Sequence, residues 1–155
     1  MAENRPGPEW SSDWVQCSII NNSGSTLTLG TPTSTSGTTS TGGGSFEGPT
    51  ASIPANGPED KTTSVWAFTA YGESGWPSGC GGTVTYHFTN GDLLVLQYNC
   101  SVTGEITWCI PLLQAAPGTS SVGSGSYFCT ATDATGVSEV GAIITIAPLS
   151  EAGNS

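Results

Sequence analysis

Apolar and small polar residues alternate along most of the chain, in short runs that end at Gly, Pro or Asn. Such alternation is typical of half-buried β-strands, and no stretch shows the 3.6-residue period of a helix. The sequence therefore predicts an all-β protein, a single-domain antiparallel β-sandwich of about eight or more short strands. The expected strands are residues 14–20, 26–29, 64–71, 82–89, 92–98, 105–110, 126–131 and 142–146.

Changes in composition along the chain suggest its domain boundaries. Residues 1–12 and 150–155 are predicted to be flexible tails, and residues 13–149 the β-sandwich domain. Within that domain, residues 30–50 consist largely of Thr, Ser and Gly. We expect this segment to be a partly ordered loop, or else flat edge strands with little side-chain mass.

The dipeptide Asn90-Gly91 between two alternating runs predicts a tight β-hairpin. A type I′ turn needs positive φ at both central residues, which Asn and Gly tolerate. The resulting two-residue loop would place Phe88 opposite Leu93, with a core face made by Val84, Tyr86, Phe88, Leu93 and Val95. The opposite face is expected under a loop or at a partner surface, and it would carry Thr85, His87, Leu94, Leu96 and Tyr98.

Five cysteines, an odd number, are spread along the chain. In the predicted hairpin register Cys100 lies opposite Gly81 and next to Cys80, so a β-bulge at Gly81-Gly82 would allow a Cys80–Cys100 disulfide. Cys109 and Cys129 would then remain to pair, and Cys17 would be free or would link two copies of the chain. The alternative is that all five are buried thiols.

Length and charge exclude several classes of function. The chain of 155 residues fits one domain, and its two basic residues face twelve acidic ones, for a net charge of −10. Nucleic-acid binding and polybasic docking on anionic membranes both need cations that this chain lacks. No apolar run is long enough to span a bilayer, and residues 1–6 do not resemble a signal peptide. We therefore expect a cytoplasmic or non-classically secreted protein.

Catalytic and metal-binding motifs are absent from the sequence. His87 is the only imidazole, and it is predicted in the middle of a strand rather than beside a nucleophile. The carboxylates are scattered, there is no C-x-x-C motif, and neither G-x-S-x-G nor a P-loop occurs. The prediction is a protein that is not an enzyme and holds no metal or cofactor.

The aromatic residues provide the strongest candidates for a binding site. Trp76 lies in a segment rich in Gly and Pro, next to Tyr71, where a large ring is hard to bury by strand packing. An exposed Trp can stack on a sugar or sit among lipid headgroups, although Trp76 could equally fold back over the end of a sheet. Trp66 is expected to share a face with Phe68 and to be part of the core.

The order of short motifs resembles that of the aegerolysins, a family of β-sandwich proteins. The likeness covers residues 14–148 and rests on VQCSIINNSGSTLTL at 15–29, GGSF at 43–46, IPA at 53–55, VWAF at 65–68, GGTVTY at 81–86 and LVLQYN at 94–99. The resemblance implies a small acidic protein related to actinoporins that recognises membrane lipids, often forming pores with a larger partner protein. It also implies an aromatic cluster at one end, made by Tyr71, Trp76 and Trp108, as the headgroup contact.

The chain departs from the family pattern after the strand that ends near residue 99. There it has Cys100-Ser101-Val102-Thr103-Gly104 in place of the usual Pro and aromatic residue, and the basic lipid-facing residues of actinoporins are missing. The first hypothesis is still a lipid-binding, cytolysin-like protein, as one component of a pore-forming pair. The alternatives are a lectin that binds a glycan, and an inert structural or self-assembling protein with a homo-oligomer joined through Cys17.

Overall fold

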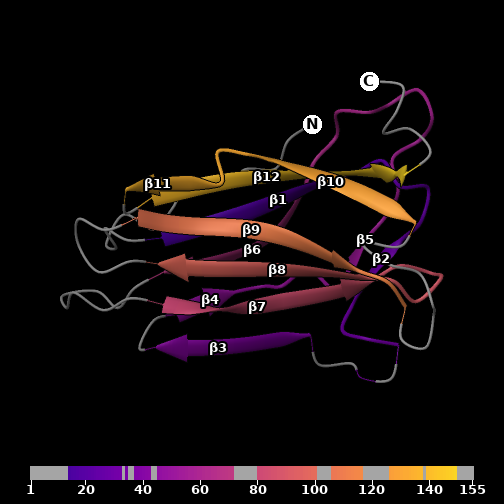
Figure 1. Ribbon diagram of the computed structural model, residues 1–155. Coiled ribbons are helices and arrows are strands. Elements are labelled where there is room, and N and C mark those ends of the chain that lie inside the picture. Colours follow the sequence, from indigo (N-terminus) through magenta and orange to yellow (C-terminus); the bar gives the residue numbers. More distant parts are fainter. Residues whose placement is uncertain are drawn as a thin grey trace.

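A computed structural model describes residues 14–32, 34, 37–42, 45–71, 80–100, 106–116, 126–137 and 139–149. These residues form two β-sheets packed face to face, which confirms the predicted all-β sandwich (Figure 1). The tails, residues 33, 35–36 and 43–44 of the Ser/Thr/Gly-rich segment, and Trp76 lie outside the described residues.

The five-stranded sheet contains both ends of the described chain. Its order is β10 (Tyr127–Thr132), β12 (Glu139–Pro148), β1 (Trp14–Asn21), β6 (Val65–Tyr71) and β4 (Ser45–Glu47). The neighbours run antiparallel except β1 and β12, which are parallel. The alternation pattern did not reveal this parallel pair, because it reports which face a residue occupies and not the direction of its neighbour.

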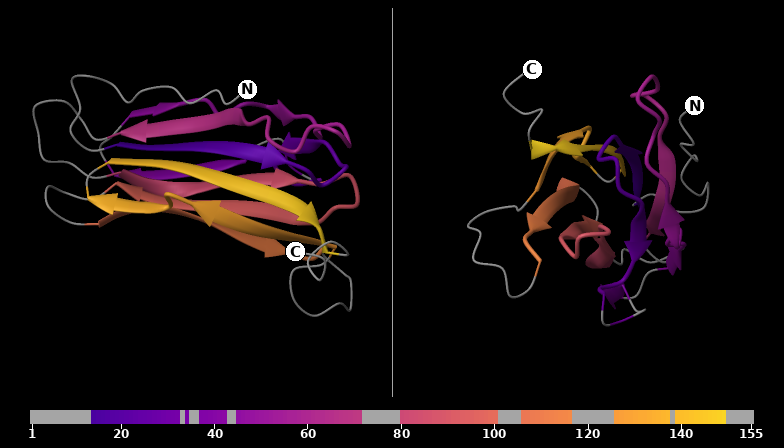
Figure 2. Two further views of the ribbon diagram at one scale, coloured as in Figure 1. Left: turned by 90° about the horizontal axis from the view of Figure 1, so that it is seen from above. Right: turned by 90° about the vertical axis from the view of Figure 1, so that its right-hand side faces the viewer.

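The seven-stranded sheet forms the other layer. Its order is β11 (Thr135–Val137), β9 (Ile106–Gln114), β8 (Leu93–Cys100), β7 (Cys80–His87), β2 (Leu27–Leu29) and β5 (Ser52–Ile53), with β3 (Thr38–Gly42) also paired to β7. In the right-hand view of Figure 2, the layer with β7 to β9 lies apart from the layer with β1 and β6. All eight predicted strands are present. β3 and β4 lie within residues 30–50, where flat edge strands were the alternative to a loop, whereas β5 and β11 were not predicted.

The β7–β8 hairpin differs from its prediction by one residue. The Gly91 N–H donates to the Phe88 carbonyl at 3.0 Å, and the Phe88 N–H donates to the Asp92 carbonyl at 2.9 Å. The loop therefore has three residues, and only Gly91 among them has positive φ, at 93°. This geometry is a type I turn closed by a glycine bulge, not the expected type I′ turn.

The shift of one residue exchanges the two faces of β8. His87 pairs with Leu93 and Tyr86 pairs with Leu94, in place of the predicted pairs with Leu94 and Val95. The inward side chains of β8 are now Leu94, Leu96 and Tyr98, all buried, whereas Leu93 and Val95 point outward. The predicted core face of β8 was thus wrong, because a one-residue slip inverts every side chain.

Aromatic contacts close the core between the sheets. The rings of Phe68 in β6 and Tyr98 in β8 lie 5.1 Å apart, and those of Phe88 and Tyr127 stack at 3.9 Å. Each pair joins a residue of one sheet to a residue at the other, so both sheets depend on the same core.

A β-bulge in β6 turns Trp66 to the other face of the strand from Phe68, although Trp66 is still buried, at 8% exposure. Cys17 pairs with Phe68 and Ser18 pairs with Trp66, so Ala67 is the extra residue. Trp66 consequently faces the outside of the five-stranded sheet, where its Nε1–H donates to the Thr69 hydroxyl at 2.9 Å. The expectation that Trp66 and Phe68 share a face was wrong, because the bulge breaks the period of two.

Candidate functional site

The outer surface of the seven-stranded sheet carries many apolar side chains over β8, β9 and β11, with a few uncharged polar ones between them. Side chains alternate across a strand, so the residues of β9 that alternate with the buried Thr107, Cys109 and Leu113 point outward, namely Ile106, Trp108, Ile110 and Leu112. The cross-strand pairs Val95–Leu112, Asn99–Trp108 and Ile106–Val137 place these outward side chains side by side. We call this surface the apolar face, and it comprises Leu93, Val95, Ile106, Trp108, Ile110, Leu112 and Val137.

The apolar face is exposed to solvent rather than covered by another element. Ile106 is 62% exposed, Val137 67%, Ile110 42% and Leu112 44%. Of the five large apolar side chains that are exposed among the described residues, these are four, and Leu149 is the fifth. A contiguous exposed apolar surface on a folded protein commonly marks an interaction site.

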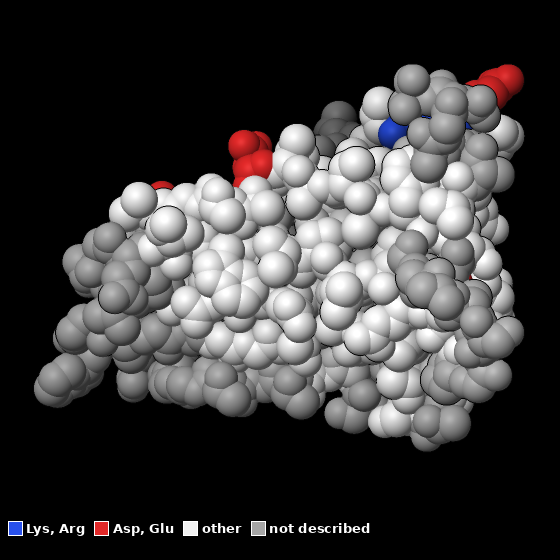
Figure 3. All heavy atoms as spheres, viewed as in Figure 1, with Lys and Arg blue, Asp and Glu red and all other residues white. Residues whose placement is uncertain are grey.

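The same sheet carries no formal charge. No Asp, Glu, Lys or Arg occurs within the bounds of β2, β3, β5, β7, β8, β9 or β11. Figure 3, which shows the molecule from the side of β7 to β9, has an uncharged surface in its centre and acidic atoms along its upper rim. The net charge of −10 is therefore carried by turns, tails and the other sheet.

The predicted aromatic cluster is only partly described by the structure. Trp108 is half-buried in the middle of the apolar face, between Asn99 and Thr135. Tyr71 is a buried residue at the end of β6, in the opposite sheet, and pairs with Trp14. The two described rings thus belong to different sheets and are not brought together, and Trp76 falls outside the described residues.

The side chain of Tyr71 also has a different environment from that of a headgroup contact. Burial raises the pKa of its hydroxyl, and the nearby Glu47 carboxylate raises it further.

The sequence pattern missed the exposed partners of Trp108, namely Ile106, Ile110, Leu112 and Val137. Apolar residues at every second position of β9 were a visible signal of one apolar side of the strand. The same alternation also occurs in a strand whose apolar side faces the core, so it did not show that this side is exposed.

Cys80 and Cys100 occupy directly opposed positions at the start of β7 and the end of β8. Cys100 is disulfide-bonded. The register therefore brings this pair together without the bulge at Gly81 that we expected, since Gly81 pairs with Asn99.

The other three cysteines are free thiols, so the expected pairing of Cys109 with Cys129 does not occur. Cys109 faces Cys17 across the sandwich, and both side chains are 0% exposed. A thiol in this position does not reach a second copy of the chain, so the expected link through Cys17 is unsupported by the fold. The hydrogen bond with Cys109 is the largest of the causes that raise the pKa of the Cys17 thiol well above its ordinary value, and burial is the second.

We predict that a thiol reagent labels the native protein at Cys129 alone. Cys129 is half-buried, and burial raises its pKa, so labelling should be slow near pH 8 and accelerate as the pH rises through and beyond the ordinary thiol range. Cys17 and Cys109 should react only after denaturation. Mass spectrometry of labelled peptides measures this, Cys129→Ser serves as the control, and modified Cys17 in the native protein contradicts it.

Other classes of site find no support within the described residues. No group of three His, Cys, Asp or Glu side chains there is placed to hold a metal ion. A search of the same residues finds no helix with the length and apolar character needed to cross a membrane.

Comparison with known proteins yields no match to any family model and none to any curated protein. The resemblance to aegerolysins therefore stays a prediction.

Proposed function

We propose that this protein is a non-enzymatic lipid-binding protein that uses the apolar face to bind electrically neutral membranes. The observation that carries the proposal is an outward sheet surface with exposed Ile, Leu and Val side chains around Trp108 and no charged residue within its strands. A cytolysin-like role together with a larger pore-forming partner, as the aegerolysin resemblance implies, extends the same proposal.

The chemistry of the apolar face suits the interface of a neutral bilayer. Apolar side chains gain free energy when they leave water, at roughly 25 cal/mol for each Å² of apolar surface. Trp is favoured at the headgroup level, because its ring is apolar and its indole N–H can find a polar partner. No charged side chain in β8, β9 or β11 has to lose its hydration during this contact.

Overall charge favours a neutral lipid surface over two other occupants. With a net charge of −10, the protein is repelled by anionic membranes, and two copies of it repel one another. A neutral bilayer has no such penalty. We therefore assign the apolar face to lipid rather than to a second copy of the chain.

Flotation with phosphatidylcholine vesicles, with and without sterol, tests the proposal. We expect the protein to float with neutral vesicles, with no gain from added phosphatidylserine and little loss at high salt, because the contact is not ionic. A blue shift in Trp fluorescence should accompany binding. The shift should shrink in Trp108→Phe and persist in Trp14→Phe, a matched change in the other sheet.

Two outcomes contradict the proposal. One is the absence of flotation with every neutral vesicle. The other is dimerisation at rising protein concentration without any vesicle binding, which would assign the apolar face to a second copy.

A further inference from the structure

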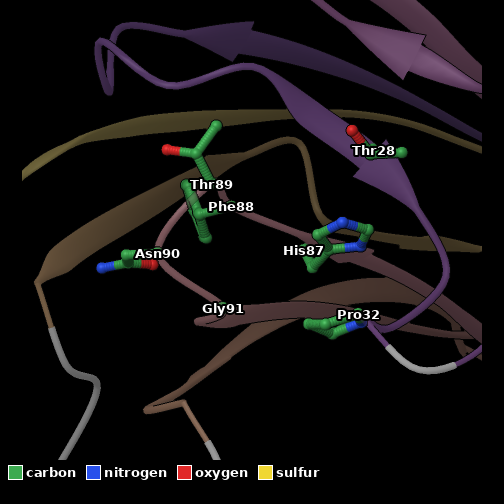
Figure 4. Close-up of a pocket in the computed structure, with 7 residues that line it drawn as sticks. All are labelled: Thr28, Pro32, His87, Phe88, Thr89, Asn90 and Gly91. Atoms are coloured by element: carbon green, nitrogen blue, oxygen red, sulfur yellow. The ribbon is translucent and has the colours of Figure 1, made fainter.

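A pocket of about 490 Å³ lies at the end of the seven-stranded sheet, beside the β7–β8 turn. Its walls are formed by β2, by Pro32 in the chain after β2, by the last residue of β7 and by residues 88–91 of the turn. In the view of Figure 4, His87 lies between Thr28 and Pro32, and the turn forms the other side. The lining residues are Thr28, Pro32, His87, Phe88, Thr89, Asn90 and Gly91.

Two polar side chains of the pocket have unused hydrogen-bonding capacity. Thr28 and His87 are directly paired between β2 and β7, so they lie side by side. The Nδ1 of His87 is 3.0 Å from the Gly30 carbonyl, which can only accept, so Nδ1 carries the proton. In the neutral ring Nε2 is then an acceptor, and among the described residues neither it nor the Thr28 hydroxyl has a hydrogen-bond partner.

The turn adds polar groups whose orientation is fixed. The Asn90 side-chain oxygen accepts the Asp92 N–H at 2.9 Å, and its NH₂ group donates one N–H to the Ser126 hydroxyl at 3.3 Å. These two bonds hold the amide in place, and the second N–H of the NH₂ group is available as a donor. The Thr89 hydroxyl lies 2.9 Å from that of Ser25, which anchors the turn to the β1–β2 connection. The pocket thus has both donors and acceptors on supports that are already ordered.

The lining excludes charged ligands and favours a hydroxyl-rich one. Among the described residues that line the pocket there is no Lys or Arg to neutralise an anion and no carboxylate to hold a cation. A sugar ring offers several hydroxyls that both donate and accept, and apolar C–H faces that can lie on the Pro32 and His87 rings. We propose that the pocket binds a neutral hexose.

The position of the pocket links this ligand to the apolar face. His87 pairs with Leu93, the first residue of that face along β8. The next outward residue of β8 is Val95, which pairs with Leu112 of β9. A hexose in the pocket can therefore be the headgroup of a glycolipid whose apolar part contacts the face. This link rests on the proposed function, whereas binding of a free sugar does not.

Histidine NMR gives a direct test, because His87 is the only histidine of the chain. Titration with free glucose or galactose should shift its imidazole Nε2 resonance, and Thr28→Val should weaken the effect. Thr130→Val, the same change on exposed β10, should leave the effect unchanged. An Nε2 resonance that stays fixed with both hexoses and with glucosylceramide vesicles overturns the proposal.

Vesicles separate the two sources of the sugar. Glucosylceramide in phosphatidylcholine vesicles should raise the affinity about tenfold over plain vesicles, the effect of one or two well-placed hydrogen bonds. His87→Phe and Thr28→Val should each remove much of this gain without changing binding to plain vesicles. Retention of the full gain in both variants counts against the pocket. Loss of plain-vesicle binding with an intact hexose response instead counts against the proposed lipid function and leaves a free-sugar site.

Discussion

Replacing both Ile110 and Leu112 with glutamate is expected to weaken binding to neutral vesicles by about a hundredfold, or roughly 3 kcal/mol. The two side chains are 42% and 44% exposed and lie two residues apart on the same outward surface of β9. The substitution removes apolar area that would leave water on binding and adds two carboxylates that would have to give up hydration. Because both residues already face solvent, the fold should tolerate the change.

The matched control places the same two charges on the opposite sheet. Thr130 and Thr132 are exposed on β10 and pair with Thr145 and Ile143 of β12. Thr130→Glu with Thr132→Glu should bind vesicles like the unchanged protein. Equal loss in both variants would mean that net charge, not the apolar face, decides binding, and unchanged binding in the β9 variant would remove the face as the contact surface. Circular dichroism and thermal melts establish that each variant is folded.

The sequence predicted the long strands well and the short ones poorly. Strands such as β8 and β12 have many alternating apolar residues, so their hydrophobic pattern is clear. In contrast, β3 reads TTSTG and β5 has only two residues, so neither carries a pattern that differs from a loop. β3 forms because the longer strand β7 offers it a free hydrogen-bonding edge, and β5 pairs with the three-residue β2.

Local irregularities, each one residue long, caused the larger errors about faces. The three-residue loop at Asn90 inverted β8, and the bulge at Ala67 separated Trp66 from Phe68. Both depend on contacts from distant parts of the chain, which a period of two does not encode.

The candidate site was only partly predictable for the same reason. The resemblance of the chain to the aegerolysins singled out Trp108. Its exposed neighbours are evident only from the pairing of β9 with β11 in the structure. The polar pocket likewise depends on the pairing of Thr28 with His87, residues far apart in sequence. His87 was expected to be an ordinary strand residue, and the fixed orientation of its ring could not be read from the pattern.

The buried carboxylate of Asp92 holds together the end of the sandwich that carries the pocket. Asp92 is 4% exposed, and its two oxygens accept the Ala116 N–H at 2.8 Å and the Ser126 N–H at 2.9 Å. These two donors lie just after β9 and just before β10. One side chain thus ties two other parts of the chain to the β7–β8 turn.

Asp92→Ala is therefore expected to lower the free energy of unfolding by about 3 kcal/mol, since it leaves two backbone donors without their charged acceptor. A loss of that size corresponds to a fall of roughly 10 °C in the melting temperature for a domain of this length. Asp92→Asn keeps one oxygen acceptor and should lose about half as much.

Glu59→Ala, which removes one negative charge from an exposed position, is the control and should melt like the unchanged protein. Urea and thermal unfolding measure these effects, and a melting temperature in Asp92→Ala equal to that of the control would show that the two hydrogen bonds do not stabilise this end. Because Asn90 and Gly91 line the pocket, the same variant should also weaken the hexose response of His87 at temperatures where the protein is still folded.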